Sequence, residues 1–341
     1  MDLARVFAGL DSVSWAELEH AYGSAEDLPD VLRALAGDEE QASEALDELW
    51  GSILHQGTVY AATASAVTFL ARMAVAGVRP VDLLVLLGGI AGSEDEYGLD
   101  EPGGCRAAVT AQLPLILPLI ASPEADVRRA AVWTAGRTGA EPALPALRER
   151  WAAEQDPAVR AELLAGLVRL DPRAAAATAL GAMAPDEPDA LRVVAVLACL
   201  DAGLPWSPAH RDTMLSLLPA DPLVSSRFDQ DRTEPLHCAV DALLRRDTAE
   251  DRSSAYELIE AALRLEDPDA RREALWAAEH ACMISRSAPA RLAPEALIPE
   301  SRARLTALAE RDLRVVTSGP EPEIVPADER LRDRARAMLG A

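Results

Sequence analysis

Residues 122–136 read SPEADVRRAAVWTAG, and this stretch decides the fold. A proline and an acidic turn come before Val127 and Arg128, which open an apolar helical pattern. The same opening recurs at Val159-Arg160, Leu191-Arg192, Leu236-His237 and Ala270-Arg271, after steps of 32, 32, 45 and 34 residues. A period near 32 without a strand signal predicts stacked helical hairpins.

Each recurrence carries an apolar stripe at positions 0, 4 and 8, counted from its opening residue. The stripes are Val127, Ala131, Ala135; Val159, Leu163, Leu167; Leu191, Ala195, Cys199; Leu236, Val240, Leu244; and Ala270, Ala274, Ala278. Positions four apart share one helix face, so each segment is predicted to be an amphipathic helix with a buried seam. Prolines stand just upstream of each helix, where the first turn tolerates them: Pro123, Pro157, Pro188, Pro235 and Pro268. Ser122, Asp156 and Asp267 are candidate N-caps, and Gly139 and Gly203 are candidate stop signals.

A second helix precedes each of these helices. Leu-Pro pairs mark two of them at 113–115 and 144–147, and residues 173–184, 208–218 and 251–265 fill the same place later. The repeating unit is therefore a helical hairpin that must stack on its neighbours to bury its seam. The predicted fold class is all-α: an α-solenoid, or superhelix, of stacked antiparallel helix pairs.

The run from Leu113-Pro114 through Ser122 to Ala131 resembles a HEAT repeat, and the short period is similar to the HEAT-like units of phycobilin lyases. The resemblance covers residues 105–285 and implies a fold that serves many tasks. The sequence departs from the pattern at 219–234, where a loop is inserted, and at Leu236-His237, which replaces the usual Val-Arg.

Three regions are expected along the chain. Residues 1–104 form an acidic helical region continuous with the solenoid, 105–285 form the repeats, and 286–341 form a helical cap with a Pro-rich linker at 317–326. In the first region, Ser14 and Glu17 fit a capping box. Helices are expected over 39–54, 58–76 and 80–91, with a mobile loop at 92–104, and further helices over 293–312 and 327–339. No sheet of more than two short strands is expected.

The negative charge of the chain is unevenly placed. The net charge is −23, and residues 1–101 hold 19 acidic residues against 4 Arg, a net −15. Such a surface repels nucleic-acid phosphates and anionic membranes and would steer a basic partner, although acidity also serves solubility. The chain contains no Lys and no Asn, which indicates a GC-rich genome rather than a function.

The cysteines and the chain start favour a reduced, cytoplasmic protein. Cys105, Cys199, Cys238 and Cys282 show no CxxC spacing, and no signal peptide or bilayer-spanning apolar run is visible. Cys199 falls on a seam position, where a small apolar residue is expected.

Arginine recurs at position 1 as Arg128, Arg160, Arg192 and Arg271. The HEAT resemblance implies that each bonds to an acid in an adjacent turn, for which Asp126, Asp189 and Asp269 are local candidates. A charge-assisted pair suits fixed stacking, so we interpret this set as a structural Arg ladder.

Position 6 lies opposite the seam on a helical wheel and carries Trp133 and Trp276. Their neighbours at positions 2 and 10 complete two rows: Arg129, Trp133, Arg137 and Arg272, Trp276, His280. We predict that these rows line a concave partner-binding face, because Trp and Arg are enriched in binding hot spots. The alternative is that each Trp packs between neighbouring repeats.

Sequence motifs for catalysis or metal binding are not readable. The five histidines (His20, His55, His210, His237 and His280) have no metal-ligand spacing, so a metal site would need partners from other repeats, and no metal or cofactor is predicted. The polar run His55-Gln56-Gly57-Thr58-Val59-Tyr60 is either a binding turn or an ordinary connection between helices.

The favoured function is a non-enzymatic scaffold that holds a protein or peptide. A sharper version is an inhibitor or immunity-type protein for a basic partner such as a nuclease toxin. The alternatives are a lyase-type enzyme with a ligand pocket lined by Trp133, Trp276 and a His, or a glycosylase-type nucleic-acid binder, which the net charge disfavours.

Overall fold

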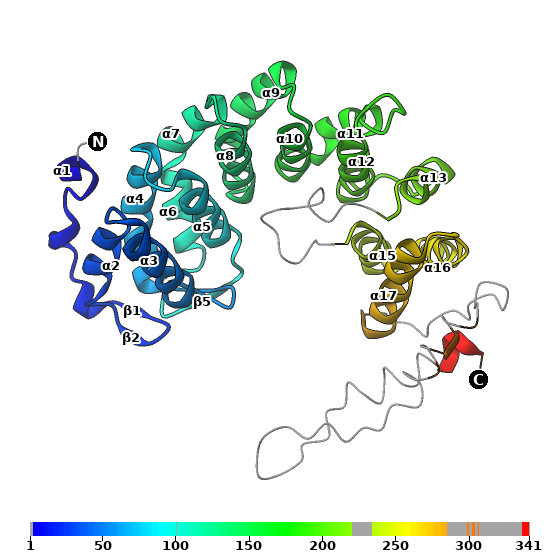
Figure 1. The fold of residues 1–341 in the computed structure, drawn as a ribbon, viewed down its shortest axis with the longest axis horizontal. Helices are drawn as coiled ribbons and strands as arrows, with labels where there is room; N and C mark the ends of the chain where they lie inside the picture. The colour runs from blue at the N-terminus through cyan, green and yellow to red at the C-terminus, as the bar shows by residue number, and fades with distance from the viewer. Residues whose placement is uncertain are drawn as a thin grey trace, which may run out of the picture. The chain divides into compact units, whose positions relative to one another are not determined.

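The computed structural model describes residues 3–99, 101–219, 234–284 and 336–340, with isolated residues at 299, 302, 303 and 306. The chain divides into two compact units, Met1–Ala175 and Ala176–Ala341 (Figure 1). The inserted segment at 220–233 and the Pro-rich linker at 317–326 lie outside the described residues, as does most of the helix expected over 293–312. The division into three regions expected from the sequence stays a prediction.

The N-terminal unit begins with short elements and continues as helix pairs. Its first elements are α1 (Leu3–Val6), η1 (Leu10–Ser12), η2 (Trp15–Glu17), β1 (Glu19–His20), β2 (Gly23–Ser24), α2 (Leu28–Ala34), α3 (Glu39–Ser52), β3 (Leu54–His55), β4 (Thr58–Tyr60), α4 (Ala61–Val75), α5 (Pro80–Gly92) and β5 (Asp95–Tyr97). The helices that follow are α6 (Gly104–Ala111), α7 (Leu113–Ile116), η3 (Leu117–Ala121), α8 (Ala125–Arg137), η4 (Glu141–Ala143), α9 (Leu144–Ala153) and α10 (Pro157–Leu170). Helix α11 (Pro172–Gly181) contains the boundary between the units.

The helices of this unit stack in chain order as two layers. Helix α8 packs between α5 on one side and α10 on the other (Figure 1). In the second layer, η3 packs against α8, and α9 packs against η3 and α10. Glycines allow the closest approach in this stack, because a Cβ on Gly136 would lie 3.0 Å from the Cα of Gly166 on α10. A helix in the middle of such a stack is buried on several faces, not only along its seam.

A three-stranded sheet corrects the expectation that no sheet would exceed two short strands. Strands β3 and β4 form an antiparallel hairpin around Gln56-Gly57, both of which have positive φ, and β5 adds in parallel beside β4. The polar run at residues 55–60 therefore connects α3 to α4 as part of a β-hairpin, and the helix expected from residue 58 begins at Ala61. The expected Ser14 capping box is also wrong, because Ser14 precedes a 3₁₀ turn and its side chain makes no cap hydrogen bond.

The C-terminal unit repeats the helix-pair arrangement. It contains α12 (Asp189–Asp201), α13 (Pro208–Ser216), α15 (Pro235–Arg246), α16 (Ala249–Leu263) and α17 (Pro268–Ile284), and residues 336–339 are helical. Helices α12, α15 and α17 pack side by side in one row, and α13 and α16 pack against that row (Figure 1). Apolar residues of these helices form one core, to which Met338 also contributes.

The predicted seam is confirmed at every position. All fifteen residues at positions 0, 4 and 8 are buried, from Val127 to Ala278. The carboxylates of Asp156 and Asp267 accept backbone N–H groups in the first turns of α10 and α17, as expected of N-caps. Ser122 instead accepts the N–H of Glu124, before α8 begins. The predicted fold class, an all-α solenoid of antiparallel helix pairs, is confirmed.

The described helices are too short or too polar to cross a bilayer singly. One bent pair, Gly104–Ala111 with Leu113–Ala121, reaches the required length and apolar composition only when its two parts are counted together.

Candidate functional site

The first predicted row, Arg129–Trp133–Arg137, lies inside the stack of the N-terminal unit. Trp133 is only 7% exposed, and Arg129 is buried beside Glu162 of α10, with 3.5 Å between Arg129 Nε and Glu162 Oε2. The Arg137 guanidinium lies 5.5 Å from the Trp133 ring centroid. This row therefore occupies the packing position that the sequence left as the alternative.

Two glycines of α5 create the space for this row. A Cβ at Gly88 would overlap the Trp133 ring, and a Cβ at Gly92 would overlap the Arg137 guanidinium. The indole and the guanidinium thus rest directly on the α5 backbone. A larger side chain at Gly88 would force the helices apart, because it would meet the rigid Trp133 ring and the α8 backbone, whereas one at Gly92 would displace the flexible Arg137 guanidinium.

The second predicted row, Arg272–Trp276–His280, is more accessible. Arg272 is exposed, whereas Trp276 and His280 are partly exposed along α17. The Arg272 guanidinium lies 5.6 Å from the Trp276 ring centroid and pairs with Asp269 at 2.7 Å. The partner-binding assignment of both rows stays a prediction, and this second row is the one whose surface a partner can reach.

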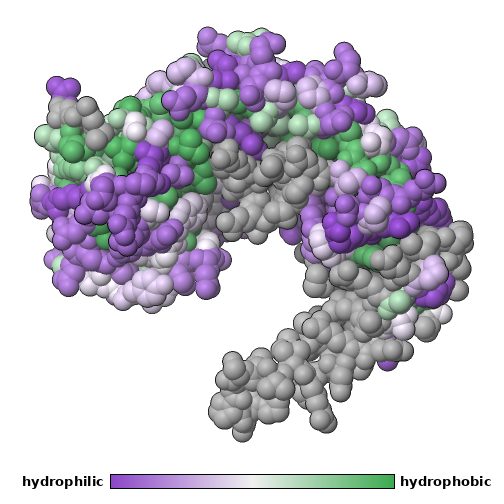
Figure 2. All heavy atoms as spheres, viewed as in Figure 1, coloured by the Kyte–Doolittle hydropathy of each residue, from purple (hydrophilic) through white to green (hydrophobic). Residues whose placement is uncertain are grey.

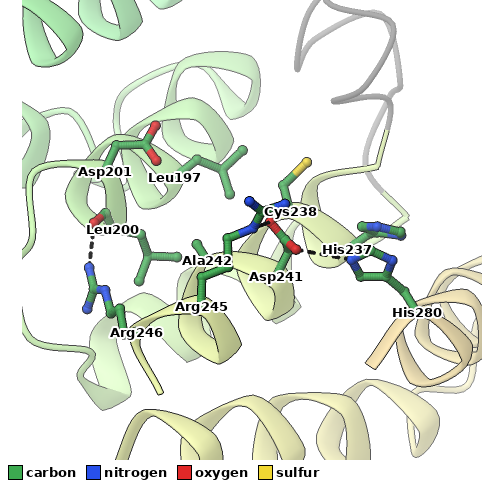
Figure 3. Close-up of a pocket in the computed structure, with 10 residues that line it drawn as sticks. All are labelled: Leu197, Leu200, Asp201, His237, Cys238, Asp241, Ala242, Arg245, Arg246 and His280. Carbon is green, nitrogen blue, oxygen red and sulfur yellow. Dashed lines mark hydrogen bonds and ion pairs between the residues drawn. The ribbon is translucent and has the colours of Figure 1, made fainter. Parts of the chain in front are cut away.

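The second row ends at a pocket of 640 Å³ within the C-terminal unit (Figure 3). Its walls come from α12, α15 and α17, and its lining is Leu197, Leu200, Asp201, His237, Cys238, Asp241, Ala242, Arg245, Arg246 and His280. The sequence singled out His280 but did not indicate that His237 and Asp241 would join it. The signal for His237 was present, since it stands where the other repeats carry Arg.

Two imidazoles and a carboxylate meet in this pocket. The His237 and His280 ring centroids are 3.6 Å apart, and His280 Nε2 lies 3.2 Å from Asp241 Oδ1 (Figure 3). Asp241 also accepts from Arg245 Nε at 2.6 Å. Burial lowers the pKa of His237 and the neighbouring His280 lowers it further, against the opposite effect of Asp241. His237 is therefore neutral near pH 7 and can donate or accept a hydrogen bond.

The pocket suits a polar side chain better than a metal ion. Within the described part of the chain, no group of three or more His, Cys, Asp or Glu residues is arranged to hold a metal. Figure 3 shows the Cys238 sulfur pointing away from the two imidazoles. The pocket is not lined by Trp133 or Trp276, so it is not the ligand pocket that the lyase alternative required.

The Arg ladder uses a different partner at each step. Arg192 pairs with Asp189 at 3.1 Å, as expected. Arg128 instead bonds Glu154 of the next hairpin through Nε at 2.9 Å and Nη2 at 3.2 Å. The Arg160 guanidinium stacks 5.0 Å from the Trp151 ring centroid, and Arg271 reaches the Leu265 carbonyl at 3.5 Å. The positions recur because each lies at a hairpin turn, while the local chemistry varies.

Glu154 is the centre of a buried charged cluster. Its carboxylate is almost fully buried and accepts from Arg128, Arg150 and the backbone N–H groups of Gln155 and Asp156. Burial acts to raise the pKa of Glu154, but the hydrogen bonds from Arg128, Asp156, Arg150 and Gln155 outweigh it and lower the pKa to about 2. The cluster ties the end of α9 to the start of α8.

Arg160→Ala is expected to lower the free energy of unfolding by about 1 kcal/mol, because it removes the stacking on Trp151. Partner affinity should not change. Denaturant unfolding and a binding assay on the same variant check this, with Arg160→Lys as a control that keeps the charge but not the planar group. Unchanged stability with lost binding would give Arg160 a binding role instead.

Residues 104–168 match the family model for HEAT repeats. This segment runs from α6 into α10, so the chain contains HEAT repeats as expected, and HEAT repeats generally serve as protein-interaction scaffolds. No match is found among curated proteins. Among solved structures, the chain is similar to the crystal structure of an engineered protein, at 14% identity and a TM-score of 0.34, over 98% of this chain and 86% of that one.

Proposed function

We propose that this chain is a non-enzymatic scaffold that binds a basic protein, in the manner of an inhibitor or immunity-type protein for a nuclease toxin. The observation that carries the proposal is the net charge of −15 on residues 1–101, within a chain that contains protein-interaction repeats. Long-range attraction between opposite charges raises the association rate of two proteins and suppresses binding to wrong partners.

The acidic residues are available to a partner. Helix α3 presents five exposed carboxylates on one short segment, which are Glu39, Glu40, Glu44, Asp47 and Glu48. The same helix turns Ala42, Ala45 and Leu49 inward, so its outer face is free to be polar. Figure 2 shows mainly hydrophilic residues over the visible face of the N-terminal unit around α3 and the β1–β2 hairpin.

The accessible row of the C-terminal unit offers short-range contacts of the kind that hold a complex together. Trp276 presents a partly exposed indole beside Arg272, and the pocket that begins at His280 is large enough for a side chain. Buried aromatic and Arg anchors dominate binding energy once a complex forms. In this proposal the acidic surface sets the association rate, and the Arg272–Trp276–His280 row slows dissociation.

The association rate with the partner should fall as salt rises from roughly 0.05 to 0.5 M, while the dissociation rate changes less. The partner is first captured from an extract of the source cell on the immobilised chain and then purified. Its association rate with the chain is measured by stopped-flow. The variant Glu40→Gln, Glu44→Gln, Asp47→Asn, Glu48→Gln should associate more slowly at low salt and show a shallower salt dependence.

A charge-matched control removes the same number of acids from the other unit. Asp186→Asn, Glu250→Gln, Glu257→Gln, Glu266→Gln alters exposed residues and should leave the association rate closer to that of the unmodified chain. Equal slowing by both variants would mean that only total charge matters. An association rate independent of salt would leave the acidic surface with a solubility role alone.

A further inference from the structure

A small cleft opens in the N-terminal unit where its two strand pairs meet. It has a volume of 380 Å³ and is lined by Glu19, His20, Ala21, Gly23, Thr58, Tyr60 and Tyr97. The β1–β2 hairpin forms one side, and the β4–β5 pair forms the other, with Tyr60 and Tyr97 as register partners. The cleft lies outside the HEAT-matching segment at 104–168. Of its lining residues, only His20, as one of five histidines, and Thr58 and Tyr60 of the run at 55–60 were considered from the sequence.

Aromatic rings dominate this cleft and its rim. The Tyr60 and Tyr97 rings meet edge to face with centroids 6.0 Å apart, and Tyr22 at the hairpin tip lies 5.7 Å from His55 in the same manner. Tyr22 is 74% exposed and Tyr97 is 61% exposed. Large aromatic side chains as exposed as these are unusual on a surface without a binding role.

The charges around the rings are negative. Glu19 supplies an exposed carboxylate at the cleft, and Asp95 and Glu96 precede Tyr97 on β5. Both ring nitrogens of His20 are engaged within the unit: Nδ1 accepts the Tyr22 N–H at 3.0 Å, and Nε2 lies 3.1 Å from Asp27 Oδ1.

Basic side chains of the same region are engaged elsewhere. Arg33 bonds Asp30, Arg72 bonds the Ala8 carbonyl, and Arg79 bonds Asp82. The cleft therefore combines aromatic faces, which attract cations, with a carboxylate and no internal cation among its described lining residues.

We propose that this cleft binds an arginine side chain presented by the basic partner, with the guanidinium against Tyr97 and Tyr60 and hydrogen-bonded to Glu19. A guanidinium fits this role better than an ammonium because it is planar, weakly hydrated and able to stack on a ring while donating to a carboxylate. The inference rests on the proposed function for the source of the arginine. It adds the chemistry by which the acidic unit would recognise that partner.

Fluorine NMR of the full chain labelled with 3-fluorotyrosine tests this directly, because the chain has only four tyrosines. Tyr60 and Tyr97 line the cleft, Tyr22 lies at the tip of the adjoining β1–β2 hairpin, and buried Tyr256 of the other unit serves as an internal reference. A capped peptide of sequence Gly-Ser-Gly-Arg-Gly-Ser-Gly should shift the Tyr60 and Tyr97 signals in a saturable way and leave Tyr256 unchanged. The same peptide with citrulline, the neutral isostere of arginine, should produce no saturable shift.

Paired variants locate the site. Tyr97→Leu leaves an apolar side chain without an aromatic ring and should raise the Kd for the arginine peptide about fivefold. Tyr97→Phe keeps the ring and should bind the peptide nearly as tightly as the unmodified chain does. Glu19→Gln should weaken binding, and Glu26→Gln, an exposed acid outside the lining, should not. Tyr22 and Tyr60 signals that keep the positions they have in the unmodified chain without peptide show that the N-terminal unit of each variant is folded.

Three outcomes would overturn the inference: equal shifts with the citrulline peptide, equal affinity for a lysine peptide, or full binding by Tyr97→Leu. Each of these leaves the salt-dependent association of the proposed function intact. The opposite result is also distinguishable. If the partner associates at a rate independent of salt but the arginine peptide still produces specific shifts, the proposed function is contradicted and the arginine-binding role of the cleft stands.

Discussion

Glu154→Gln is expected to lower the free energy of unfolding by about 3 kcal/mol, measured by denaturant unfolding at pH 7. The substitution keeps the size of the side chain but removes the charge that Arg128 and Arg150 share, and both guanidinium groups are mostly buried. Removing one partner of a buried pair leaves the other charge uncompensated, which costs more than the pair contributes. Glu149→Gln, on the exposed side of α9, is the matched control and should change stability little.

The same cluster sets an acid limit on stability. The folded-state pKa of Glu154 is about 2, below its ordinary value of 4.5, so its contribution is complete above about pH 4.5 and is lost as the pH falls towards 2. The stability difference between the unmodified chain and Glu154→Gln should therefore shrink over that interval. A difference that stays constant from pH 5 to pH 2.5 would mean that the carboxylate charge is not what stabilises the turn.

Trp133→Ala is expected to cost about 3–5 kcal/mol of stability, because the buried indole fills the space above Gly88 between α5 and α8. Trp276→Ala is the natural comparison, since it changes the same repeat position where the ring is partly exposed. It should cost less stability and weaken partner binding by about 2 kcal/mol.

Melting temperature and partner affinity measured on both variants separate the two roles. If Trp133→Ala loses affinity for the partner without losing stability, Trp133 has a partner-binding role and not a packing role. A large loss of stability with unchanged affinity for Trp276→Ala would remove the second row from the binding site.

The helical part of the fold was predictable because its signal is local. The seam repeats every four residues within each helix, and burial at all fifteen seam positions follows from that period alone. The sheet was not predictable in this way. Strand β5 is three residues long, and its partner β4 lies on the far side of two helices in the chain. This pairing depends on how α4 and α5 pack, because that packing brings β5 beside β4. A local sequence pattern does not contain this information.

The candidate site shows the same division. A helical wheel places Trp133 opposite the seam. It does not show that neighbouring helices on both sides of a central helix also bury side chains outside the seam. The spacing of Gly88 and Gly92 on one face of α5 was a readable signal for a bulky neighbour. The meeting of His237 with His280 could not be read, because it requires the packing of α15 against α17.

The parallel pairing of β4 with β5 has a mechanical consequence. These strands enclose α4 and α5, since one strand enters the first helix and the other leaves the second. When the two ends of the chain are pulled apart, force enters β4 from its amino end and leaves β5 from its carboxyl end. The hydrogen bonds between two parallel strands are then loaded together in shear instead of one at a time. The pairing therefore acts as a clamp that shields the enclosed helical hairpin from tension, whereas a hairpin joined only by turns carries the load directly.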